Sequence, residues 1–424
     1  MLRTYENRLI AILFLAFGTV FLDRMSLNFL VPFFINELHL NNTQVGLLGG
    51  ITAISWAVAG VVFGVLSDRF DTRKPLLVVA VLVFAMFSGL SGVVGGFVTL
   101  LAFRSLMGAA EGVVIPLSTP LVMADSTPRR RGLNMGLLQS AGGVLGGLAG
   151  PVIVVAIAEH YGWRHAFYLT ALPALVTAVL IMAFVRDRKA RSAVETGIGT
   201  PVETGSRTPR IDLAATLKAL KQRNVVICLL IAACYFAWFV TTQTFVPLYL
   251  VQHKGYSAST MSWVAAGLGI AWTVWGAVIP AVSDRFGRKP TIIAFTAVAT
   301  LSPLAVVFVS SPALLLPLVV ISYTGIGCFG LFSAAIPSES VPPELVATTI
   351  GLIIGTGETV GGFLVPTLAG HLADLYGLDI TLYLSAGAAA VSLVLCLFLT
   401  ETAPSATGAL AAPGQVSPTS ANLR

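Results

Sequence analysis

The chain has 424 residues, of which 56% are hydrophobic and only 10% are charged, and its mean hydropathy is +0.88. Soluble domains carry roughly 25% charged residues, so the composition excludes an ordinary water-soluble protein. The net charge of +6 lies mostly in short polar segments between apolar runs, which indicates membrane orientation and argues against nucleic-acid binding.

Twelve apolar runs follow one another, each of about 18 to 25 residues, the length that a helix needs to cross a bilayer. The first run is too long for the core of a signal peptide and lacks a small-residue cleavage site, so we expect it to be retained. The sequence predicts helices over residues 8–35, 45–67, 75–95, 97–123, 132–158, 164–185, 224–251, 259–283, 290–309, 312–337, 346–373 and 380–400. We therefore expect an all-α membrane protein of two six-helix bundles.

A polar stretch separates the two sets of helices. Residues 186–223 are rich in Arg, Thr, Gly and Pro, which predicts a linker between bundles over residues 1–185 and 224–400. Within this linker, Asp212–Lys221 is compatible with a short amphipathic surface helix. Residues 401–424 are expected to be a disordered cytoplasmic tail.

The two halves of the sequence repeat each other. A shift of 215 residues aligns Gly142 with Gly357 and Pro151 with Pro366, and further matching pairs need no gap. Duplication explains this better than chance enrichment in glycine. Six plus six helices in parallel repeats are typical of transporters whose site lies between the halves near the middle of the bilayer.

Lys and Arg gather on one side of a twelve-helix arrangement: near the N-terminus, in the loops after the second and eighth helices and before the fifth, and in the linker. By the positive-inside rule this side, with both termini, is cytoplasmic. We expect a multi-pass protein of a bacterial inner membrane that works as a monomer in contact with lipids.

The sequence gives no sign of catalysis. The four cysteines lie inside apolar runs without metal-ligand spacing, as small core residues do. No nucleotide-binding loop, metal cluster or nucleophile arrangement is present, so we expect no enzymatic activity, no metal and no cofactor.

The loops after the second and eighth helices carry the same charged pattern, Ser-Asp-Arg-Phe followed by Arg-Lys, about 215 residues apart. This pattern resembles the signature loop of the major facilitator superfamily, although Asp71 stands where that family prefers Gly. A carboxylate among guanidinium groups at a helix end can latch neighbouring helices in one state and release them in another. The resemblance implies gating roles for Asp68, Arg69, Arg73, Lys74, Asp284, Arg285 and Arg288. Simple positive-inside anchoring remains the alternative.

Five ionisable residues fall inside predicted membrane helices: Asp23, Arg24, Arg104, Glu111 and Glu358. Each charge at such depth costs at least about 2.5 to 3.5 kcal/mol, so these residues normally face a cavity or a partner and mark function. Adjacent Asp23 and Arg24 point about 100° apart on their helix, whereas Arg104 and Glu111, seven residues apart, share one face. Structural ion pairs within the N-terminal half are the alternative.

The segments Phe21–Asn28, Arg104–Gly112 and Pro247–Leu250 resemble the anion:cation symporter family, which includes sialin and bacterial hexuronate and galactonate carriers, over nearly the whole chain. The resemblance implies proton sites at Asp23 and Glu111, and coupling or anion-binding roles for Arg24 and Arg104. Members of that family often carry Asn where Glu358 stands here. Glu358 is therefore a third proton site, an acceptor for a substrate hydroxyl, or a sign of a different substrate charge.

Further residues are candidates for lining a substrate pocket between the halves. The polar and aromatic candidates are Asn28, Tyr235, Trp238, Gln243, Trp272 and Tyr323. Aromatic side chains in membrane helices more often pack or face lipid, but together these permit a sugar-derived or aromatic acid.

The sequence thus predicts a proton-coupled symporter of a small organic carboxylate that works by alternating access. A lysolipid carrier of the spinster type is one alternative, and a lipid-sized apolar cavity would favour it. A drug or metabolite exporter is another, favoured if Arg24 and Arg104 lie buried against protein. A receptor or scaffold would need neither duplicated gates nor buried titratable groups.

Overall fold

The computed structural model describes residues 5–69, 74–127, 130–186 and 221–403, and these residues contain 12 helices long and apolar enough to span a membrane. They correspond in order to the predicted runs, and most boundaries differ by only a few residues. The predicted linker helix Asp212–Lys221 lies almost wholly outside the described residues. The prediction of twelve transmembrane helices is confirmed.

The N-terminal half provides six of these spans. The fifth span is one continuous helix, Arg131–Tyr161, that consists of two α-helical segments with a π-helical segment between them. The elements are α1 (Tyr5–Phe34), α2 (Asn42–Arg69), α3 (Lys74–Leu90), η1 (Ser91–Val93), α4 (Phe97–Asp125), α5 (Arg131–Ala141), η2 (Gly142–Ala149), α6 (Gly150–Tyr161) and α7 (Trp163–Phe184).

The C-terminal half provides the other six. Its elements are α10 (Arg223–Gln252), α11 (Ala258–Phe286), α12 (Arg288–Ala299), α13 (Leu301–Phe308), α14 (Pro312–Ser322), α15 (Gly325–Gly330), η3 (Leu331–Ala335), α16 (Ile336–Ser340), η4 (Pro343–Leu345), α17 (Val346–Thr356), η5 (Gly357–Leu364), α18 (Val365–Tyr376) and α19 (Asp379–Leu397).

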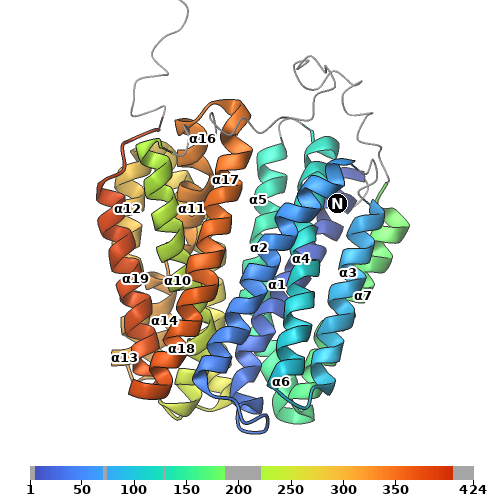
Figure 1. Ribbon diagram of the computed structural model, residues 1–424, viewed down its shortest axis with the longest axis vertical. Helices are drawn as coiled ribbons and strands as arrows, with labels where there is room; N and C mark the ends of the chain where they lie inside the picture. The colour runs from blue at the N-terminus through green and yellow to red at the C-terminus, as the bar shows by residue number, and fades with distance from the viewer. Residues whose placement is uncertain (1–4, 70–73, 128–129, 187–220, 404–424) are drawn as a thin grey trace, which may run out of the picture.

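The two halves stand side by side, with their helices roughly parallel to the long axis of the molecule (Figure 1). Both ends of the described chain lie at the same end of the bundle, as an even number of spans requires. We call this end the termini end. Many large apolar side chains, such as Val98, Val176 and Leu314, remain exposed on the outside, which fits a surface that faces lipid rather than water.

The internal repeat of the sequence has a structural counterpart. The π-helical segments η2 and η5 begin at Gly142 and Gly357, 215 residues apart. Gly162 and Gly377 are also 215 residues apart, and each adopts a positive φ, of 87° and 92°, at the turn into the next helix. Glycine adopts this backbone conformation readily because it has no side chain. The duplication therefore extends to backbone irregularities that hydropathy alone does not predict.

The halves pack against each other at the end opposite the termini, where one hydrophobic cluster contains residues of both halves, among them Phe34, Leu48, Phe245 and Ala369. Small residues allow helix backbones to meet there: a Cβ atom on Gly50 would come within 2.9 Å of Phe363. Closer to the middle, Gly147 of η2 lies against Gly269 of α11.

Candidate functional site

Asp23 and Arg104 form an ion pair that is closed inside the N-terminal half. Both side chains have no exposed surface, and Arg104 Nη1 lies 3.4 Å from Asp23 Oδ2. Asp23 also accepts hydrogen bonds from Ser88 of α3 and, at 3.2 Å, from Thr170 of α7. The Arg104 guanidinium lies over the Phe167 ring, 4.7 Å from its centre. This pair joins α1, α3, α4 and α7.

Glu111, two turns further along α4, is fully buried. Neither of its carboxylate oxygens has a hydrogen-bond partner among the described residues. A buried carboxylate without such bonds is costly and commonly marks function. The sequence predicts that Arg104 and Glu111 share one face of the helix, but they do not form a hydrogen bond with each other, because the guanidinium group of Arg104 pairs with Asp23.

Arg24, the neighbour of Asp23, points across to the other half of the molecule. Its Nη2 donates a hydrogen bond to Glu358 Oε2 at 3.4 Å, and the two side chains are 9% and 4% exposed. Glu358 is the second residue of η5, and π-helical turns often occur at functional sites. The pair links residues 334 positions apart and crosses from one half to the other.

A cavity of about 10 Å³ lies between the halves beside this pair. Arg24, Asn28 and Thr52 of the N-terminal half line it, together with Phe239, Gln243 and Thr244 of the C-terminal half. Arg24 thus faces a cavity while Arg104 is buried against protein, so the two arginines do not share one environment. In this conformation the space is on the order of one water molecule, and an organic substrate fits only when the halves separate.

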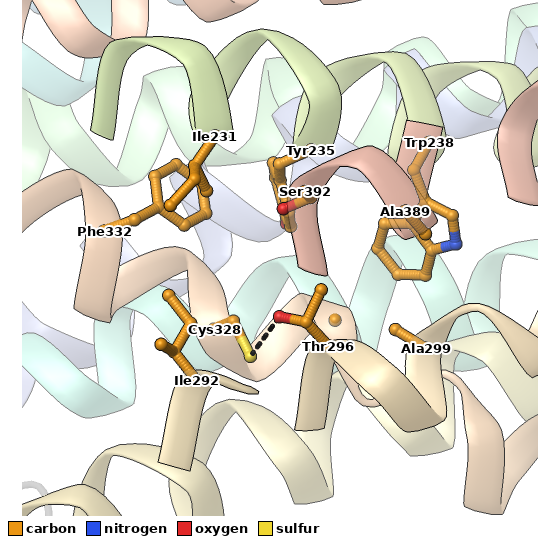
Figure 2. Close-up of a pocket in the computed structure, with 11 residues that line it drawn as sticks. Ile231, Tyr235, Trp238, Ile292, Thr296, Ala299, Cys328, Phe332, Ala389 and Ser392 are labelled. Carbon is orange, nitrogen blue, oxygen red and sulfur yellow. Dashed lines mark hydrogen bonds between the residues drawn. The ribbon is translucent and has the colours of Figure 1, made fainter. Parts of the chain in front are cut away.

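Three of the predicted aromatic lining residues lie elsewhere. Tyr235 and Trp238 border a second cavity, of about 20 Å³, inside the C-terminal half, where Ile231, Thr296 and Cys328 lie nearby (Figure 2). Tyr323 packs on Trp238 with ring centres 4.6 Å apart.

The remaining candidates lie at the interface between the halves. Asn28 and Gln243 line the cavity itself. Trp272 makes edge contacts with Phe21 of α1 and Phe239 of α10, at ring-centre distances of 5.2 and 5.6 Å. The C-terminal side of the cavity therefore combines one aromatic side chain, Phe239, with the polar side chains of Gln243 and Thr244.

The two copies of the charged loop differ in what can be described. Arg73 lies outside the described residues, as do the side chains of Asp68 and Arg69, while Lys74 Nζ donates to the carbonyl of Met182 at 2.8 Å.

In the second copy, Arg288 contacts Asp284 at 2.5 Å and Glu339 of α16 at 3.0 Å. Arg285 lies over Phe286, with 5.5 Å from its guanidinium carbon to the ring centre. This charge cluster ties together helices of the C-terminal half.

Sequence reasoning missed the polar contact that joins the halves at the end opposite the termini. The backbone N–H groups of Asn42 and Thr43, at the start of α2, donate to Asp374 of α18 at 2.8 and 2.9 Å, and Thr43 Oγ1 donates at 2.6 Å. We call this contact, with the packing of Gly46 and Gly50 against η5 and α18, the closed end. The spacing of Gly46 and Gly50 by four residues is the signal that predicts such close helix packing.

Comparisons with known proteins agree with this architecture. The sequence model of the Major Facilitator Superfamily matches residues 13–366. The chain is 29% identical to the hexuronate transporter of Bacillus subtilis (strain 168), over 91% of this chain and 93% of that protein. It is 26% identical to the sialic acid transporter NanX of Escherichia coli (strain K12), over 88% and 89%.

The fold is similar to that of a bacterial homolog of the human lysosomal transporter Spinster, in an inward-facing and occupied conformation. The TM-score is 0.69 at 16% identity, covering 94% of this chain and 97% of that one. At this identity the likeness concerns the fold alone.

Proposed function

This chain belongs to the Major Facilitator Superfamily and is a transporter rather than an enzyme, and we propose that it carries a small organic anion together with protons. The observation that carries the proposal is Arg24, a cation that lines the cavity between the two halves. A guanidinium group matches a carboxylate in geometry and charge. The names of the two relatives, a hexuronate and a sialic acid transporter, support an acid as the substrate.

The proton is carried by buried carboxylates. Asp23, Glu111 and Glu358 are the candidates, and all three are almost fully buried. Glu111 is the best placed, because its oxygens are free of hydrogen bonds to the described residues and a proton can be exchanged there without breaking one. Asp23 is held by Arg104, so a change in its protonation alters the contact between α1 and α4.

Transport proceeds by alternating access. The closed end holds the halves together away from the termini, and the charged loops at the termini end act as the opposing gates. With the termini in the cytoplasm, as the positive-inside rule implies, the conformation is closed to the outside of a bacterial inner membrane. One chain contains both halves of the site, so a monomer suffices.

The proposal is tested in proteoliposomes that hold the purified protein, with radiolabelled galacturonate, sialic acid, muconate and benzoate offered under an imposed pH gradient. We expect at least one acid to accumulate, and accumulation to stop when the gradient is dissipated. Gradient-independent equilibration of every acid would contradict proton coupling, and absence of uptake of any acid would contradict the substrate class. In this conformation neither cavity is large enough for a lipid or for an organic acid, so cavity size does not separate a lysolipid carrier from an anion carrier.

A further inference from the structure

The charges around the cavity do not balance. The described part of the membrane core holds three carboxylates, Asp23, Glu111 and Glu358, and two guanidinium groups, Arg24 and Arg104. Asp23 and Arg104 neutralise each other within the N-terminal half, which leaves Arg24 as the cation at the cavity. An anion that bound Arg24 would therefore lie beside the carboxylate of Glu358, so the site must do more than neutralise one carboxylate.

Glu358 is present in one half of the repeat only. The shift of 215 residues that superposes η2 on η5 places Gly143 at the equivalent position, and a side chain there would run into Thr273. The C-terminal half therefore has a carboxylate at this position of the repeat, and the N-terminal half has none. A Cβ atom added at Gly362 would come within 2.9 Å of Glu358 Oε2, and the hydrogen bond that Glu358 accepts among the described residues comes from Arg24.

A substrate carboxylate that binds Arg24 competes with Glu358 for the N–H donors of the guanidinium group. A carboxylate has about four acceptor positions, and leaving them empty in a buried site is unfavourable. A donor on the substrate compensates for the loss. Because Arg24 and Glu358 are in contact when the halves are closed, a substrate held by both residues would carry this donor near its carboxylate.

This inference rests on the proposed function and names its substrate class. We propose that Glu358 is a specificity residue that accepts a hydrogen bond from a hydroxyl or ammonium group near the carboxylate of the substrate. The site then selects hydroxylated or amino-bearing acids over acids with the same carbon skeleton that lack the donor. The polar side chains of Asn28 and Gln243, which line the same cavity, are available to the remaining donors of such a substrate.

The test compares matched pairs of acids on the purified full chain by equilibrium binding: mandelate with phenylacetate, and gluconate with hexanoate. Wild type should bind the hydroxylated member about tenfold more tightly or better, the effect of one hydrogen bond to a charged acceptor. In Glu358→Gln the preference should fall to within about twofold. Glu37→Gln is the matched control, because Glu37 is an exposed carboxylate at the end of the bundle. This variant should keep the wild-type preference for the hydroxylated acid.

Each result is decisive. Equal binding of both members by wild type, or a preference that survives in Glu358→Gln, would overturn the role of Glu358 while leaving the proposed function intact. If wild type binds neither member of either pair nor any acid of the uptake screen, the proposed function itself fails. The wild-type comparison needs no substitution, so it decides the question even if Glu358→Gln does not fold.

Discussion

At the scale of single residues, Arg24 and Arg104 have different surroundings. Arg104 has no exposed surface and holds Asp23, whereas Arg24 faces the cavity and contacts Glu358 across the interface. We therefore expect ion-pair stabilisation from Arg104 of α4 and anion binding by Arg24 of α1. Substitutions at the two sites should separate these effects.

Arg24→Gln should weaken binding of the transported acid by roughly ten- to hundredfold, because a charged hydrogen-bond donor is lost from the cavity. Arg104→Gln should instead lower the thermal stability of the purified protein, because Asp23 would stay buried without its counter-charge. Calorimetric binding and thermal unfolding, measured on both variants, check the division. Equal loss of affinity with unchanged stability in both would show that Arg104 also binds the anion.

Glu111→Gln should retain binding and substrate counterflow but lose accumulation driven by a pH gradient. Glutamine resembles a permanently protonated carboxyl group, so the step that binds substrate is kept and the step that releases a proton is removed. Counterflow and gradient-driven uptake in the same proteoliposomes provide the comparison. A variant that still concentrates substrate would assign the proton to another residue.

Sequence could indicate these residues but not their partners. A charge inside an apolar run is visible without a structure, so all five buried ionisable residues could be named. Arg24 and Glu358 meet only through the packing of the two halves, 334 positions apart in sequence. In α10 nearly every residue between Tyr235 and Leu250 is buried, so hydrophobic periodicity cannot show that Trp238 faces a different cavity from Gln243.

At the scale of helices, the closed end depends on a helix cap provided by the other half. Asp374 of α18 accepts three hydrogen bonds from the first residues of α2, where a carboxylate is favoured by the exposed N–H groups and the helix dipole. A cap of this kind holds only while the two halves stay together. Its loss should therefore change conformation more than folding.

Asp374→Ala should shift the population toward a conformation that is open at this end, by roughly tenfold in the equilibrium constant for the loss of charge-assisted hydrogen bonds. Distances between spin labels on α2 and α18 measure the shift. Asp379→Ala is the control at the same end, because Asp379 bonds Tyr249 within the C-terminal half at 2.6 Å. Identical distance distributions in wild type and both variants would remove the gating role of Asp374.

A second cap lies at the termini end, where Glu401 accepts backbone hydrogen bonds from Arg288 and Lys289 at 2.8 and 3.0 Å. Burial acts to raise the pKa of Glu401, but the backbone N–H donors of Ala403, Arg288, Lys289 and Thr402 outweigh it, and the pKa is lowered. Because the pKa is lowered on folding, the ionised carboxylate of Glu401 adds to the free energy of unfolding at any pH above its unfolded-state pKa, near 4.3. This contribution is lost as the pH falls through the folded-state pKa.

Glu401→Gln should consequently lower the midpoint of thermal unfolding by roughly 1 to 3 °C at pH 7, as the loss of a helix cap does. The difference between variant and wild type should shrink at acidic pH, below about 4. Unfolding of the detergent-solubilised protein over a series of pH values measures it. A difference that persists undiminished at low pH would mean that the carboxylate charge is not the source.

At the scale of the whole molecule, hydropathy and the internal repeat predict the fold almost completely. The spans follow from the length of apolar runs, and the repeat at 215 residues predicts the two related halves. Sequence does not predict the π-helical turns at Gly142 and Gly357 or which end of the bundle is closed, because both follow from contacts between helices far apart in the chain.

We propose that the anion and the proton cross the membrane together, in one cycle of opening and closing between these halves. The direct measurement is the external pH of weakly buffered proteoliposomes when a transported acid is added at zero membrane potential, with wild type compared with Glu111→Gln. We expect alkalinisation outside the wild-type vesicles in step with anion uptake, and no alkalinisation outside vesicles that hold Glu111→Gln. Anion uptake by wild type without any movement of protons would contradict it.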